Sequence, residues 1–121
     1  MRYILMTFVA PERVRWWEQE ATAEERKAHV DDVMSWFAEY GGKGWLAGGA
    51  ELGSAPQAKT VRRRGVTDGP FAETKEVLGG FIVVDVPTHA DAMEMASRWP
   101  GLIHDGDAVE VRPEGTTGSE A

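Results

Sequence analysis

The sequence lacks cysteine and long apolar runs, and both absences narrow the classes of function that remain. None of its 121 residues is cysteine, which excludes a disulfide framework and thiol chemistry and fits a reducing compartment. No segment approaches the roughly 18 consecutive apolar residues of a membrane span. The apolar opening MRYILMTFVA is short and soon followed by acids, so it does not match a signal peptide. We expect a cytoplasmic protein that makes no membrane contact.

Basic residues are also scarce, which disfavours nucleic acid as a partner. The chain has 13 lysines and arginines against 20 aspartates and glutamates, a net charge of −7, and such a surface repels phosphate backbones. The basic run from Lys59 to Arg64 could attract an anion, although such runs more often protect the edge of a sheet. The segment LAGGAELG has neither the P-loop lysine nor the dinucleotide glycine spacing. We therefore expect no cofactor.

Two predicted strands, residues 2–8 and 78–86, are apolar on both faces. Successive side chains of a strand point to opposite faces, so both faces of these strands must be covered. Further strands are predicted at residues 44–53, 58–64 and 108–113. In the first strand Tyr3, Leu5 and Thr7 oppose Ile4, Met6 and Phe8; in the strand at 78–86 Phe81 and Val83 oppose Ile82, Val84 and Val86.

Two capping boxes mark the starts of the main helices. Thr22 and Glu25 open a helix that should run to about Tyr40, and Thr88 opens a second helix with Asp91 at its third position. Pro11 could open a short helix before them. Apolar residues at helical spacing predict the buried stripes: Val30, Val33, Met34 and Phe37 in the first helix, and Ala92, Met95, Ala96 and Trp99 in the second.

The order of elements predicts an α+β fold of the ferredoxin-like type. Strand, helix, strand, inserted β-hairpin, strand, helix and strand form a split β-α-β pattern, βαββαβ with an insertion. The domain should span residues 1–113, and the polar tail at 114–121 should be disordered. Two helices can cover only one face of a four-stranded sheet. Because the central strands are apolar on both faces, we expect a homodimer in which two sheets pack face to face.

His29 is the first candidate for chemistry. On the predicted helix it falls together with Trp36 and Tyr40, at the border between the buried stripe and solvent. A histidine titrates near neutral pH and can donate or accept a proton, so this border could form one wall of a catalytic cleft. The alternative is that these three residues only pack together.

The other two histidines give no metal-binding pattern. His89 falls in the first turn of the second helix and should be exposed, and His104 lies in the polar loop HDGD. Neither has the spacing of a ligand pair with the other or with His29. We expect no metal site.

The stretch TDGPFAETKE, residues 67–76, supplies the second candidate. Gly69 and Pro70 fix a turn, and Asp68 precedes it. An aspartate there often does no more than bond to the backbone amides that follow. The other residues of this stretch also have ordinary structural explanations. Phe71 would be a core residue, and Glu73, Lys75 and Glu76 would form a solvated surface.

The segment TDGPFAETKEVLGGFIVVDV, together with MRYILM, SRWP and VEVRP, resembles the DGPF proteins, a branch of the YCII-related family. The resemblance covers residues 1–113. It implies a ferredoxin-like fold that dimerises through its sheets as a dimeric α+β barrel, and an active site of a histidine and an aspartate, here His29 and Asp68. In the wider family an aspartate often precedes the proline after the second helix. Here Trp99 precedes Pro100.

These residues favour an enzyme that moves a proton on a small, polar organic substrate, as an isomerase or lyase does. Asp68 would orient His29 and raise its basicity. Trp36, Tyr40 and Phe71 could wall the cleft, and Glu73 or Lys75 could bind a polar substituent. One alternative is a non-catalytic metabolite sensor in the same cleft. The other is a protein-interaction module, and the resemblance implies a link to regulation by alternative sigma factors.

Overall fold

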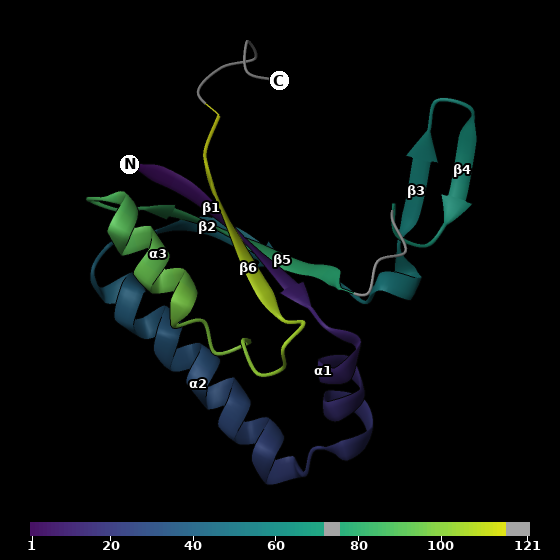
Figure 1. The fold of residues 1–121 in the computed structure, drawn as a ribbon, viewed down its shortest axis with the longest axis horizontal. Coiled ribbons are helices and arrows are strands. Elements are labelled where there is room, and N and C mark those ends of the chain that lie inside the picture. Colours follow the sequence, from purple (N-terminus) through teal and green to yellow (C-terminus); the bar gives the residue numbers. More distant parts are fainter. Residues whose placement is uncertain (72–75, 116–121) are drawn as a thin grey trace.

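The chain forms one four-stranded antiparallel sheet with helices on one face, and a separate two-stranded hairpin (Figure 1). The computed structural model describes residues 1–71 and 76–115. Along the chain lie β1 (Arg2–Val9), α1 (Pro11–Arg15), the π-helical turn η1 (Trp16–Glu20), α2 (Ala23–Gly42), β2 (Leu46–Glu51), the short 3₁₀ turn η2 (Ala55–Gln57), β3 (Lys59–Arg62), β4 (Gly65–Asp68), β5 (Val77–Asp85), α3 (His89–Ser97) and β6 (Ala108–Pro113).

The sheet order β2-β5-β1-β6 is that of a ferredoxin-like α+β fold, as predicted. The β3–β4 hairpin is inserted between β2 and β5. Beyond β6, the Glu114 backbone N–H donates to the Arg2 carbonyl oxygen at 3.0 Å. The predicted tail lies mostly in residues 116–121, outside the described part of the chain. Within the described part, no helix is both long and apolar enough to cross a membrane.

Both capping boxes form as predicted and set the starts of α2 and α3. The Thr22 hydroxyl accepts from the Glu25 backbone N–H at 3.0 Å, and the Glu25 carboxylate accepts from the Thr22 backbone N–H at 3.0 Å. Thr88 and Asp91 repeat this exchange at the start of α3. The C-terminal ends of α2 and α3 are linked to each other. Arg98, at the end of α3, donates to the carboxylate of Glu39 and to the hydroxyl of Tyr40 on α2. These contacts fix α2 and α3 side by side on the sheet.

The two central strands are apolar on both faces, and the helices of the chain cover only one of these faces (Figure 1). Leu5 and Val84 are buried under the helices with the rest of the core. On the opposite face the side chains of β1 and β5 are only half-buried or exposed, which agrees with the alternation predicted for these strands. This face carries Ile4, Met6, Phe8, Phe81 and Val83.

The predicted buried stripe of α2 is wrong in its N-terminal half. Val30 and Met34 are 46% and 62% exposed, whereas Trp36 and Tyr40, predicted at the border of a cleft, are core residues. Trp36 packs edge-on against Trp99 and donates its indole N–H to the Met95 carbonyl oxygen at 3.1 Å. The helix therefore packs on the core through its C-terminal half, and its N-terminal half does not reach the sheet.

The β3–β4 hairpin projects beyond the N-terminal end of β5, away from the helices (Figure 1). Val61 and Val66 are cross-strand partners on the hairpin, and they are 79% and 60% exposed. Arg63 and Arg64 form its turn. An isolated two-stranded ribbon is marginally stable in water, and this ribbon leaves its apolar pair uncovered within one chain.

Candidate functional site

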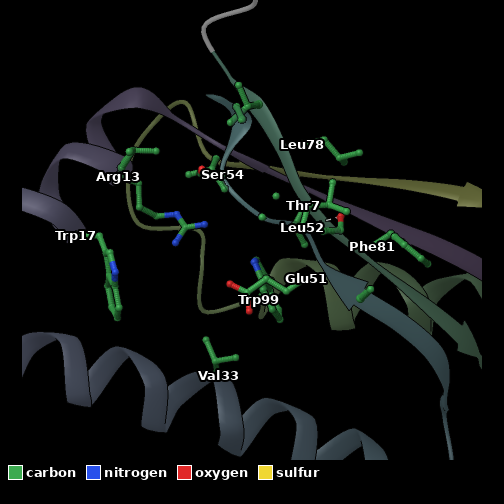
Figure 2. A pocket seen from close by; sticks show the side chains of 18 of the residues that line it. Thr7, Arg13, Trp17, Val33, Glu51, Leu52, Ser54, Leu78, Phe81 and Trp99 are labelled. Carbon is green, nitrogen blue, oxygen red and sulfur yellow. Dashed lines mark hydrogen bonds between the residues drawn. The ribbon is translucent and has the colours of Figure 1, made fainter. Parts of the chain in front are cut away.

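A cavity of about 1420 Å³ lies between the N-terminal half of α2, the α1–η1 segment and one end of the sheet (Figure 2). The end of the sheet is open here because its helix-facing positions are small. Thr7 pairs with Gly80 across β1 and β5, and Gly49 pairs with Ile82 across β2 and β5. Thr7, Gly49 and Gly80 present no large side chain to α2. The exposed Val30 and Met34 line the space instead.

Two of these small positions are held by glycine for steric reasons. A Cβ on Gly49 would lie 2.4 Å from the Phe81 carbonyl oxygen, and the φ of Gly49 is +141°, which L side chains rarely adopt. A Cβ on Gly80 would lie 2.8 Å from the Ala50 carbonyl oxygen. The close approach of β2 and β5 thus requires glycine where the cavity opens.

His29 lines this cavity from α2. Its half-buried ring meets the rings of Trp16 and Trp17 edge-on, with centroid distances of 6.0 and 5.9 Å. Burial, followed by the positive charge of Arg13, lowers the pKa of His29 below its ordinary value. The imidazole is therefore neutral at pH 7 and can accept a proton.

Arg13 projects into the same cavity from α1 (Figure 2). Its side chain is 16% exposed, and its Nε donates to Asp107 Oδ1 at 3.2 Å. Trp17, Val33 and Trp99 line the space around the guanidinium. A cation thus faces a mainly apolar cavity beside a neutral histidine.

Asp107 holds Arg13 in place from the loop between α3 and β6. Its side chain is 0% exposed. It accepts from the backbone N–H groups of Ala10 at 2.9 Å, Ile103 at 3.2 Å and His104 at 2.8 Å. A buried carboxylate that accepts several N–H bonds is a rigid anchor, so the position of Arg13 is fixed by the fold.

Glu51 and Thr7 supply further polar groups. Glu51 is the register partner of Gly80, which places its side chain on the helix-facing side of the sheet, and Figure 2 shows it projecting into the cavity. The Thr7 hydroxyl donates to the Gly80 carbonyl oxygen at 3.3 Å. Glu51 is an exposed residue at the end of β2, whereas Thr7 is buried. Together with Arg13 they surround an apolar space with a few polar groups, as in many ligand sites.

Asp68, the predicted partner of His29, lies elsewhere in the chain. It ends β4 on the hairpin, its side chain is 88% exposed, and it accepts from Lys59 Nζ at 2.7 Å. It is not among the described residues that line the cavity. The fold of a single chain therefore does not bring Asp68 and His29 together.

The predicted wall residues are also placed elsewhere. Trp36 and Tyr40 belong to the core. Phe71 is exposed beside the hairpin, where the Arg62 guanidinium lies 5.0 Å from the centre of its ring. Glu73 and Lys75 lie outside the described residues. Among the predicted site residues that the structure describes, His29 is the one that lines the cavity.

Within residues 1–71 and 76–115, no cluster of histidines and carboxylates could hold a metal ion. His89 is exposed at the start of α3, where its ring lies 5.5 Å from that of Tyr3. The Nδ1 atom of His104 lies 3.6 Å from Asp107 Oδ2. These two histidines thus contact residues outside the cavity wall.

Arg13 and Asp107 were not predicted from the sequence. Asp107 belongs to the loop HDGD, and an aspartate near glycine is an ordinary turn residue. The contact that gives it importance joins two positions separated by 94 residues. The one feature of the sequence that could have indicated this site is the position of Arg13. It lies in the short segment after β1, which a ferredoxin-like fold places at the end of its sheet.

Comparisons with known proteins identify relatives of the whole domain. Residues 1–113 match the model of a family described as the YCII-related domain. The chain is also similar to an uncharacterised protein of Rhizobium meliloti (strain 1021), with 33% identity over 94 residues, which are 74% of this chain and 76% of the relative.

Proposed function

The chain belongs to the YCII-related family, and on this premise we propose that it is a small-molecule enzyme of isomerase or lyase type in which His29 transfers a proton. The observation that carries the proposal is the neutral, half-buried His29 on the wall of a large cavity. Such an imidazole can remove a proton from a bound substrate and return it to another atom. Isomerisation and elimination require no covalent intermediate with the protein.

The charge of Arg13 contributes to this chemistry. A positive charge close to the imidazole disfavours its protonated form, so His29 enters the reaction as a base. The same charge would stabilise negative charge that develops on the substrate as the proton leaves. Arg13 and His29 line the cavity from different helices, α1 and α2, so a substrate between them could contact both.

We propose that the functional unit is a homodimer, with the uncovered sheet face as its interface. That face carries the half-buried side chains of Ile4, Met6 and Val83 and the exposed Phe81. A sheet face on which successive strands present apolar side chains is normally covered by another layer. A second copy is a self-complementary cover, because a two-fold interface places the same patch on both partners.

In such a dimer the hairpin could bring Asp68 to the His29 of the other copy. The exposed pair Val61 and Val66 gives the hairpin an apolar surface to pack on a partner. The cavity, at about 1420 Å³, exceeds the roughly 300–1,000 Å³ of ordinary ligand pockets, so a segment from the partner would narrow it. Asp68 would then orient His29 from the neighbouring chain.

A metabolite sensor would use the same cavity without forming a product. A thermal-shift screen of small organic compounds tests the site, and nuclear magnetic resonance of each mixture tests for product. We expect some compounds to stabilise the wild type but not His29→Gln, and one of them to be converted. His89→Gln is the matched control, because His89 is exposed outside the cavity.

Equal stabilisation of the wild type and His29→Gln by every compound that binds would contradict the proposed site. Compounds that depend on His29 but are never converted would favour the sensor. If no compound binds, the small-molecule function fails, and a protein-interaction module becomes the better account of the exposed hairpin.

A further inference from the structure

The guanidinium of Arg13 has more N–H donors than its contact with Asp107 uses. Arginine carries five N–H donors in a planar fork. Among the described residues, this guanidinium donates one hydrogen bond, from Nε to Asp107. The side chain is 16% exposed and points into the cavity (Figure 2). The terminal nitrogens of the guanidinium are not shut off from solvent, so an acceptor in the cavity can take the place of water on these donors.

We propose that the Arg13 guanidinium binds the carboxylate of a small organic acid and holds that acid beside His29. This inference rests on the small-molecule site proposed above and names its ligand class. Two terminal N–H donors match the two oxygens of a carboxylate, and such forked pairs are strong and directional. Asp107 holds the opposite edge of the guanidinium, so little freedom is lost when the acid binds.

The remainder of the cavity favours an acid with an apolar body. Trp17, Phe37 and Trp99 present aromatic rings to the space, and Val33 and Leu52 present aliphatic side chains. Flat or cyclic hydrocarbon groups bury well against such walls. The ligand class is therefore an aromatic or alicyclic carboxylic acid.

Glu51 restricts the charge of this acid. Its carboxylate projects into the cavity with Arg13 (Figure 2), and it would repel a second anionic group on the ligand. It can accept a hydrogen bond from a hydroxyl group instead. We expect monocarboxylates to bind better than dicarboxylates, and a hydroxyl substituent to improve binding.

A purely structural role for Arg13 gives a different expectation. If Arg13 served only to connect α1 to the loop of Asp107, a lysine could keep that ion pair, and ligand binding would not depend on the fork. A lysine supplies a compact point charge and cannot reproduce a forked contact. Arg13→Lys therefore separates a structural tie from a carboxylate site.

The test uses mandelate as the probe and mandelamide as its neutral analogue. Binding is followed by the fluorescence of the tryptophans and by the imidazole resonances of His29, which Trp16 and Trp17 flank. We expect the wild type to bind mandelate at least roughly tenfold more tightly than mandelamide, because a forked, charge-assisted contact is lost in the amide. Arg13→Gln should lose this difference, and Arg13→Lys should retain only part of it.

Arg26→Gln is the matched control for general electrostatics. Arg26 is an exposed residue of α2 and is not among the described residues that line the cavity. Its replacement should leave mandelate binding nearly unchanged. Thermal melting of each variant confirms that it folds, and the lysine variant keeps the test valid if the glutamine variant does not.

Several outcomes would overturn the proposal. These are equal binding of mandelate and mandelamide by the wild type, undiminished mandelate binding by both Arg13 variants, and a loss in Arg26→Gln equal to that in Arg13→Gln. Absence of saturable binding of benzoate, mandelate and cyclohexanecarboxylate at millimolar concentrations would also overturn it. His29→Gln separates the two proposals, because it should bind both probes more weakly but keep the preference for mandelate over mandelamide, while losing any turnover. If it keeps this preference and the wild type converts no acid, the carboxylate site stands and the proton-transfer function fails.

Discussion

The Arg13 Nε atom donates to Asp107 Oδ1 at 3.2 Å, and this bond joins α1 to the loop that leads into β6. The carboxylate of Asp107 also accepts the Ala10 N–H at the end of β1. One fully buried side chain thus connects the first and last strands and fixes a cation on the wall of the cavity. The same contact serves the fold and the candidate site.

Removing this carboxylate should destabilise the protein strongly. Asp107→Ala leaves buried backbone N–H groups without an acceptor and Arg13 without its partner, a change that costs about 3–5 kcal/mol when a buried ion pair is broken. Urea unfolding measures the loss. The neighbouring Asp105→Ala is the control, because Asp105 is exposed. A loss in Asp107→Ala no larger than that in Asp105→Ala would show that the anchor is unimportant.

Stability should fall in mild acid because of His29. Its pKa is lowered in the folded chain by burial and by Arg13. In the unfolded chain His29 has the ordinary histidine pKa of about 6.5. The unfolded state therefore binds the proton more readily. The contribution of His29 is fully present above about pH 6.5 and is lost as the pH falls below that value.

Unfolding free energies of the wild type and His29→Gln, measured between neutral pH and about pH 5, check this expectation. The advantage of the wild type should shrink as the pH decreases. His89→Gln shows what the removal of an exposed histidine does by itself. Parallel pH profiles for the wild type and His29→Gln would contradict the burial of a neutral imidazole.

Charge on the uncovered sheet face should separate the proposed dimer. Val83→Asp places a carboxylate on this face, where it would be desolvated in the interface at a cost of several kcal/mol. Light scattering coupled to size exclusion should give a dimer for the wild type and a monomer for the variant. Met93→Asp, at an exposed position of α3, should leave the mass unchanged. A wild-type monomer at micromolar concentration would refute this interface.

Mixed dimers can reveal whether Asp68 acts on the His29 of the other copy. His29→Gln and Asp68→Asn should each lose the conversion of compounds found in the screen. A mixture of the two variants re-forms one complete site in each mixed dimer, so each mixed dimer should have up to about half of the activity of a wild-type dimer. Failure to recover any activity, with mixed dimers present, would exclude the contribution of Asp68 from the partner.

Local rules were sufficient to predict most of the fold. The boxes at Thr22 and Thr88 depend only on residues three positions apart, and the alternation in β1 and β5 depends only on the pleat of a strand. The buried half of α2 could not be predicted in this way. Which half of α2 is buried depends on the small residues Thr7, Gly49 and Gly80, which lie far away in the sequence on β1, β2 and β5. Because these residues are small, Val30 and Met34 have no surface to pack against.

The candidate site was predicted only in part. His29 was identified and lies on the cavity, but Arg13 and Asp107 depend on a contact between the two ends of the chain. The turn at Asp68 was recognised, yet its position on a projecting hairpin depends on how that hairpin leaves the sheet. The role of Asp68 and the dimer remain predictions for the experiments above.

Deuterium exchange tests the proton-transfer account most directly. Each carboxylic acid that stabilises the wild type but not His29→Gln is incubated with both proteins in deuterated water, and deuterium on its carbon atoms is measured by nuclear magnetic resonance. The account predicts that the wild type introduces deuterium into at least one of these acids and that His29→Gln does not. Exchange at the same rate with both proteins, or no exchange in any acid whose binding requires His29, would contradict it.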